Sequence, residues 1–256
     1  MAYGYLLDGN KRILKGVYSH SQPKLNFDLN SGKIATLLIL SEKVRNIAFD
    51  IDDKKFYEEM VKIFYSSGEL KIEDMKKDSS EILKEQSIIA GVSNWEGYFQ
   101  EISEIILNDT NFIQKLSENK KYKTGFRTFL KEFQIMQDFS TEVLLNGNRM
   151  DGLQFGTYIR NKQKNYFQKT KNISFFLTLC DINIKKLIEE TDWEEVPTFI
   201  STRHEIVHNP NNTRVIKNYS KDKIEHVLKN MSNLIGILDK ILFTNDQPSV
   251  GDFMLS

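Results

Sequence analysis

The sequence predicts a mostly α-helical protein, in which a helical bundle follows a small β-containing unit at the N-terminus. The bundle is predicted by long segments whose apolar residues recur at helical spacing, above all residues 74–107 and Lys221–Phe243. The N-terminal unit is predicted by Asp8-Gly9, a typical hairpin turn between two apolar runs. The expected units are an α+β unit of unknown role at residues 1–70, an α-helical domain at 71–245 and a flexible tail at 246–256.

The N-terminal unit is expected to contain a hairpin and one further strand. The apolar runs of the hairpin cover residues 3–7 and 11–18. Apolar and polar residues then alternate, which is the period of a half-buried strand. The alternating apolar residues are Leu25, Phe27 and Leu29. Residues 33–40 fit a strand or a helix, and Asp52 is placed to cap a short helix that ends near residue 64.

The helical domain is expected to contain several amphipathic helices. They cover residues 74–107, 124–146, 182–190, 191–208 and 221–243. Asn108-Asp109-Thr110 breaks the first of them, and Thr124 is placed to cap the second. Asn209-Pro210 ends the helix at 191–208 near His208, because the residue before a proline is disfavoured in the helical conformation.

The composition excludes several classes of protein. Lys plus Arg equals Asp plus Glu, at 35 residues each, so any surface for nucleic acid must be local. Cys180 is the only cysteine, which excludes a disulfide framework and suits a reducing, cytoplasmic location. No apolar run approaches the length of a membrane span, and the first residues lack the pattern of a secretion signal. We therefore expect no membrane partner.

Six residues near the end of the helix at 191–208 form the densest cluster of groups suited to catalysis. They are Arg203, His204, Glu205, Ile206, Val207 and His208, followed directly by Asn209. As Arg-x4-His, Arg203 and His208 form an arginine–imidazole pair suited to a phosphodiester. As HExxH, the same stretch matches the pattern of zinc peptidases. A helix end rich in His and Arg is also favoured by the helix dipole alone, so a solvated face is the third interpretation.

A second candidate site is the basic and aromatic segment at residues 149–172. It holds six Lys and Arg residues against one acid, Asp151. Cations contact phosphates and aromatic rings stack on unpaired bases, so this composition suits RNA. The RNA-binding candidates are Arg160, Lys162, Lys164, Tyr166 and Lys169. The alternative is a solvated helical face whose aromatic rings turn inward.

The order of these segments resembles the HEPN superfamily, most closely its RiboL-PSP-HEPN-like branch, whose first helix carries a WExY-like signature. The resemblance rests on Ser93-Asn94-Trp95-Glu96-Gly97-Tyr98, on the stretch from Arg203 to Asn209 and on the final amphipathic helix. It covers roughly residues 73–244. Arg203, His204 and His208 fit the family motif Arg-x4-6-His, in which a polar residue often follows the arginine. The resemblance implies a dimerising helical bundle, which in many members is a metal-independent ribonuclease.

The function implied by the resemblance is a toxin or antiviral-defence (abortive infection) endoribonuclease that needs no cofactor. Attack by the 2′-hydroxyl of RNA would leave 2′,3′-cyclic phosphate ends. The residues suit this chemistry. Imidazole titrates near neutrality, so we expect His208 to act as general base or acid, a contribution of roughly 10²–10⁴-fold. The Arg203 guanidinium can fork onto two phosphate oxygens. His204, Glu205 and Asn209 are candidates for supporting roles in this catalytic site.

Helix geometry raises two difficulties for this mechanism. Positions five apart lie about 140° from each other on an ideal helix, so Arg203 and His208 share a face only if the helix unwinds near His208. One histidine also cannot act as base and acid in the same step. A homodimer with a composite active site would supply a second copy of each group. His204, on the same face as His208, is the alternative second group.

Two other functions stay open. A zinc peptidase would use His204 and His208 as ligands with Glu225 as the third, although Asn209-Pro210 ends the helix and the Trp95 segment goes unexplained. A non-catalytic HEPN module would bind RNA, a nucleotide or another protein without turnover. A toxic nuclease is also expected to need an antitoxin or a regulatory partner.

Overall fold

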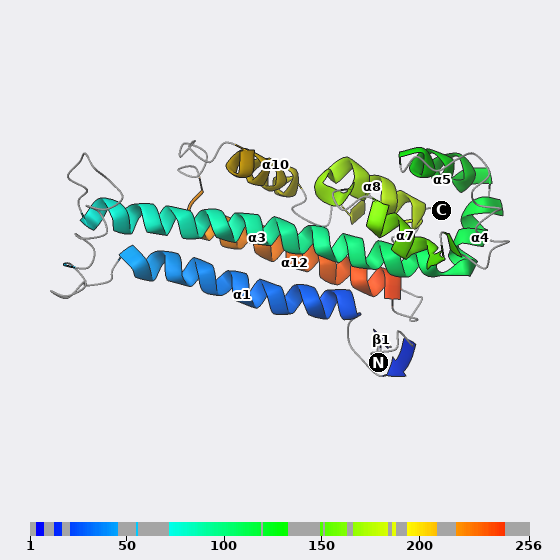
Figure 1. The fold of residues 1–256 in the computed structure, drawn as a ribbon, viewed down its shortest axis with the longest axis horizontal. Coiled ribbons are helices and arrows are strands. Elements are labelled where there is room, and N and C mark those ends of the chain that lie inside the picture. The colour runs from blue at the N-terminus through cyan, green and yellow to red at the C-terminus, as the bar shows by residue number, and fades with distance from the viewer. Residues whose placement is uncertain are drawn as a thin grey trace.

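The described part of the chain is mostly helical, as the sequence predicts (Figure 1). The computed structural model describes residues 4–7, 13–16, 21–45, 55, 72–118, 120–132, 149–150, 152–162, 166–183, 186–187, 194–208 and 219–243. Three long helices form the frame: α1 (Gln22–Arg45), α3 (Ile72–Asn108) and α12 (Lys221–Phe243). The shorter helices are α4 (Thr110–Glu118), α5 (Lys120–Glu132), α7 (Phe155–Lys162), the 3-10 helix η1 (Tyr166–Gln168), α8 (Thr170–Leu179) and α10 (Glu195–His208). None of the described helices combines the length and apolar character that crossing a membrane requires.

Two short hairpins supply the paired strands of the described residues. β1 (Gly4–Leu7) pairs antiparallel with β2 (Ile13–Gly16), which confirms the predicted N-terminal hairpin. β3 (Arg149–Met150) pairs antiparallel with β4 (Leu153–Gln154). Gly152 lies in the turn between β3 and β4 with φ +77°, a conformation that favours glycine.

The strand predicted around residues 25–29 is wrong, because these residues belong to α1. Phe27, Ile34 and Leu38 recur at helical spacing and are buried in the core, so packing overrides the local alternation. Ser21 begins the helix, since its hydroxyl accepts the Lys24 backbone N–H at 3.3 Å. Among the described elements, α1 has the most extensive contact with α3.

α1 runs antiparallel to both α3 and α12 (Figure 1). Asn94 of α3 donates from Nδ2 to the Phe27 carbonyl at 2.9 Å, which ties the first third of α1 to α3. At one end of α1, Lys221 pairs with Glu42 at 2.9 Å. The other end is joined to α12 by hydrogen bonds from Ser21 to Asp239.

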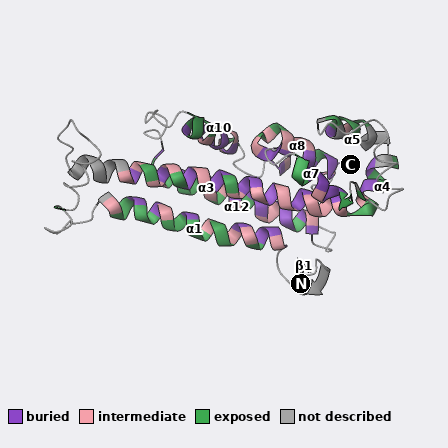
Figure 2. Ribbon diagram, viewed as in Figure 1, coloured by how far each residue is buried: buried purple, intermediate pink, exposed green. Residues whose placement is uncertain are grey.

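The core is centred on α3, which is covered on two sides (Figure 2). α1 and α12 pack along one side, and α7, η1, α8 and α10 cover the other. Trp95 and Phe99 of α3 are fully buried with ring centroids 4.9 Å apart, and the Phe99 ring lies 5.9 Å from Phe167. Gly156 lets α7 approach closely, because a Cβ there would overlap the Glu104 carbonyl oxygen.

The other predicted helices meet different outcomes. α3 ends at Asn108 and α12 spans Lys221–Phe243, as predicted. α10 begins at Glu195, after a turn residue at Glu194 and so later than predicted, and it is helical through His208, beyond which the predicted end lies outside the described residues. α5 begins at Lys120, so Thr124 lies inside it and does not cap it. The predictions for residues 46–54, 56–64, 133–146 and 188–193 and for the tail lie outside the described residues.

Removal of the Asp239 carboxylate should loosen the start of α1. This carboxylate is 2% exposed and accepts hydrogen bonds from the Ser21 backbone N–H, at 3.0 Å, and from the Ser21 hydroxyl. Asp239→Ala leaves both donors without this acceptor, so we expect the free energy of unfolding to fall by about 1–3 kcal/mol. Denaturant unfolding measures the change. Asn233→Ala, at an exposed position of α12, is the control and should change it by at most about 0.5 kcal/mol. Equal losses in the two variants would contradict this role of Asp239.

Candidate functional site

α10 carries the candidate catalytic residues and is fixed by one face against α3 and α12. Val196, Phe199 and Ile206 of this face are buried. Thr202, also buried, places its hydroxyl 2.8 Å from the hydroxyl of Tyr219, just before α12. These contacts lie before the motif and, at Ile206, within it, so they fix which face of α10 each motif residue occupies.

Arg203 interacts with Glu96 of α3. Glu96 is only 7% exposed, and burial raises the pKa of its carboxyl, whereas the Arg203 guanidinium and a hydrogen bond with the Gln168 side chain lower it. Arg203 Nε is itself buried and has no hydrogen-bond partner among the described residues, and the same holds for Glu96 Oε1. A buried acid, a guanidinium and an amide therefore form a polar cluster between α3, α10 and η1, which we call the Glu96 cluster.

His204 and His208 lie together on the outer face of α10. Both side chains are exposed, and their ring centroids are 4.2 Å apart with the ring planes at 51°. The spacing of four residues places them one above the other on a helix. Glu205 is exposed beside them, and Asn209 lies outside the described residues. Two imidazoles within one protomer are therefore available to the same ligand.

The structure divides the predicted catalytic residues into two groups. Arg203 interacts with Glu96, and His204 lies beside His208. α10 stays helical through His208, so the geometry of a regular helix applies to the whole motif. Arg203 is partly buried and lowers the pKa of the buried Glu96 carboxyl, whereas His208 is exposed beside His204. Arg203 and His208 therefore lie on different faces of α10, as expected for a helix that does not unwind near His208.

Two of the predicted RNA-binding residues are engaged with the protein itself: Arg160 is exposed but ion-paired, and Tyr166 packs inward. Arg160 Nη1 lies 2.6 Å from Glu104 Oε2, and this ion pair attaches α7 to α3. Tyr166 is 3% exposed, and its ring packs 5.6 Å from Phe129, so it belongs to the core. The inward orientation weighed for this segment therefore holds for the Tyr166 ring.

Two predicted lysines are exposed. Lys162 Nζ lies 5.4 Å from the centre of the Tyr158 ring, a cation–π contact. Lys169 directly follows Gln168, so its backbone adjoins the Glu96 cluster. Lys164 lies outside the described residues.

The zinc interpretation needs a third ligand near the two histidines. Glu225 is exposed on α12, and its neighbour His226 lies 3.5 Å from Glu195 at the start of α10. Glu195 precedes His204 by nine positions, which is about 13 Å along a helix axis. Within the described ranges, no group of three His, Cys, Asp or Glu side chains is placed to hold a metal ion.

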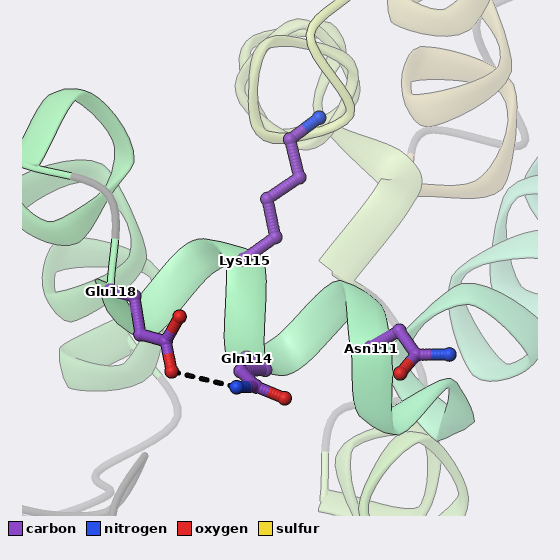
Figure 3. Close-up of a pocket in the computed structure, with 4 residues that line it drawn as sticks. All are labelled: Asn111, Gln114, Lys115 and Glu118. Atoms are coloured by element: carbon purple, nitrogen blue, oxygen red, sulfur yellow. Dashed lines mark hydrogen bonds between the residues drawn. The ribbon is translucent and has the colours of Figure 1, made fainter.

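A shallow surface hollow lies on α4, away from the motif of α10 (Figure 3). It is lined by Asn111, Gln114, Lys115 and Glu118. Gln114 donates to Glu118 at 2.8 Å, whereas Lys115 points away from this pair, with Nζ 4.0 Å from Asp181. All four lining residues belong to one helix, so we assign the hollow no part in the candidate site.

Glu96 and Gln168 are the residues whose place in the site the sequence did not reveal. In the sequence, Glu96 stands out only as one residue of the Trp95 segment. One signal was present: Glu96 follows Val92 by four positions, so it is an acid on an apolar helix face. An acid at a buried position needs a partner, and its partner comes from α10. Gln168 carried no comparable signal.

Comparison of the chain with models of protein families, with curated proteins and with solved structures gives no match. The residues themselves therefore carry the argument about function.

Neutralising Glu96 should stabilise the folded protein at neutral pH. Its raised pKa means that folding favours the protonated carboxyl, so the charged form destabilises the fold above that pKa and ceases to do so as the pH falls through it. We expect Glu96→Gln to raise the free energy of unfolding at pH 7 by on the order of 1 kcal/mol, the cost of one unsatisfied buried polar atom. The gain should vanish toward pH 4.5, the usual pKa of a glutamate.

Thermal unfolding of both proteins across this pH range measures the difference. Glu225→Gln, at an exposed position, is the control and should follow the wild type at every pH. A Glu96→Gln protein that is less stable than the wild type at pH 7 would show that Arg203 and Gln168 more than offset the burial.

Proposed function

We propose that this protein is a metal-independent endoribonuclease of the HEPN type. The observation that carries the proposal is the interaction of Glu96 with Arg203. Glu96 belongs to the Trp95 segment and Arg203 to the Arg-x4-His motif, so this electrostatic interaction relates the two segments on which the resemblance rests. An exposed pair of imidazoles lies on the same helix as Arg203.

The two histidines of one protomer can supply the base and the acid. In the proposed reaction, one imidazole removes the proton of a 2′-hydroxyl, and the 2′-oxygen attacks the adjacent phosphorus. The bond from phosphorus to the 5′-oxygen then breaks, and the second imidazole donates a proton to that oxygen. The products are a 2′,3′-cyclic phosphate and a free 5′-hydroxyl. His204 and His208 take these two roles.

The role assigned to Arg203 is to stabilise the negative charge that builds on the phosphate oxygens in the transition state. Glu96 and Gln168 are proposed as positioning residues, because a guanidinium attracted by a buried carboxylate on one side can present its remaining nitrogens to a phosphate. Since Arg203 and His208 lie on different sides of α10, the strand is proposed to cross the end of the helix. The C-terminal end of a helix carries partial negative charge, which disfavours a phosphate, and the cations Arg203 and Lys169 offset it.

A homodimer with a composite site is the other source of a second imidazole. In that arrangement, Arg203 of one protomer and His208 of its partner would act on the same phosphate. The self-contained site is favoured because His204 and His208 already lie side by side in one chain. A mixture of the Arg203→Ala and His208→Ala proteins distinguishes the composite site from the self-contained site. Only a composite site can regain activity, because a mixed dimer then combines an intact Arg203 of one protomer with an intact His208 of the other.

A non-catalytic module that binds RNA or a nucleotide is the second candidate function. It is favoured by one observation: the partly buried Arg203 interacts electrostatically with Glu96, whereas His208 is exposed. Such a module keeps RNA binding and shows no turnover. The toxin or defence role implied by the resemblance adds a cellular expectation, that expression arrests growth in a manner that depends on His208.

The decisive assay is cleavage of single-stranded RNA in the presence of EDTA. We expect 2′,3′-cyclic phosphate ends and a loss of at least about 10²-fold in rate for Arg203→Ala, His204→Ala and His208→Ala, since each removes a group that acts in the transition state. His226→Ala is the matched control, because this exposed histidine of α12 lies near Glu195 at the opposite end of α10.

Three results would overturn the assignment. Cleavage that EDTA abolishes and zinc restores would favour the peptidase-like metal site. Normal cleavage by all three variants would place the chemistry elsewhere in the protein. RNA binding without cleavage by the wild type would favour the non-catalytic module.

A further inference from the structure

α1 exposes an apolar stripe on the side that faces away from the core. Among the described residues, four of the seven exposed large hydrophobic side chains lie on this one helix. They are Leu25 at 38%, Leu29 at 66%, Ile39 at 48% and Leu40 at 42% exposure. A solvent-facing helix of a monomer usually presents polar residues there, so this face is unusual.

The outward positions of α1 follow the spacing of a coiled coil. They are Leu25, Leu29, Gly32, Thr36, Ile39 and Lys43, which we call the outer seam. Their separations alternate between four and three residues, the repeat that lets two helices stay in contact along their length. Lys43 is the one charged residue of the outer seam, and it stands at its end.

Gly32 gives a second and independent reason to expect a helix on this seam. Glycine in the interior of a helix costs about 0.5–1 kcal/mol relative to alanine. The protomer itself does not need it, because a Cβ at Gly32 would meet nothing within 4 Å. A small residue at the centre of an apolar seam is suited to the close approach of another helix.

We propose that the outer seam docks the α1 helix of a second copy of this chain, antiparallel and about a two-fold axis level with position 34. In this register, Leu29 lies opposite Ile39 of the other copy and Gly32 lies opposite Thr36. The apolar stem of Lys43 covers Leu25. The spacing is the same read from either end, so one surface is complementary to itself, as an isologous dimer requires.

The area of the outer seam sets the strength of the dimer. The seam spans 18 residue steps, about 27 Å, on a helix about 10 Å wide, so it buries a few hundred Å² per protomer. A stable interface of standard size buries about 800 Å² per partner. The dimer is therefore a weak one, with a dissociation constant of about 1–100 µM.

This dimer is independent of the proposed nuclease site. α1 and α10 lie on opposite sides of α3, so pairing through the outer seam leaves both α10 helices uncovered (Figure 1). The test is carried out on the full chain without RNA, and its failure would not bear on the cleavage assay.

Sedimentation equilibrium over a concentration series tests the proposal. The wild type should shift from monomer to dimer, and Leu29→Lys or Ile39→Glu alone should raise the dissociation constant at least 10-fold. An equimolar mixture of the two variants should recover dimers, because the new lysine of one chain lies opposite the new glutamate of the other. Parallel pairing of α1 would not place these positions together.

Asn30→Lys is the matched control, because it adds the same charge at an exposed position of α1 outside the outer seam. It should dimerise as the wild type does. All three substituted positions are exposed, so the variants should fold, and circular dichroism checks this. A wild type that is monomeric at about 100 µM, or a mixture that stays monomeric, would overturn the proposal.

Discussion

The interaction of a buried carboxylate with a guanidinium connects α3 to α10, and the candidate site depends on it. Glu96 is nearly inaccessible to solvent, and burying a charge is unfavourable unless its partners satisfy it. The partners satisfy it incompletely, since Glu96 Oε1 and Arg203 Nε both have no hydrogen-bond partner in the described part of the chain. A cluster that destabilises the fold in this way is typical of residues retained for function.

α3 and α12 could be predicted from the sequence because each has one continuous apolar face. The bounds of α12 and the end of α3 follow directly from that periodicity. α1 could not be predicted from the sequence, because Leu25 and Leu29 are exposed on its outer side while Phe27 is in the core. Apolar residues on two sides of a helix imitate the alternation of a strand. The unusual outer face of α1 therefore caused the wrong prediction.

The candidate site was predictable only in part. The pairing of His204 with His208 follows from their spacing, which any helix would produce. The direction of Arg203 depends on how α10 packs against α3, a contact between segments about 100 residues apart that no local pattern encodes. Composition also cannot separate a tyrosine that stacks on a base from one in the core, and Tyr166 is in the core.

The central claim is that Arg203, His204 and His208 act on one RNA phosphate without a metal. The most direct measurement is a crystal structure with a short single-stranded RNA whose 2′-hydroxyls are methylated, so that they cannot attack. We predict one phosphate at the end of α10, with its oxygens bonded to the Arg203 guanidinium and an imidazole on either side. A strand bound elsewhere, with Arg203 still turned to Glu96 and both imidazoles free of RNA, would contradict the account.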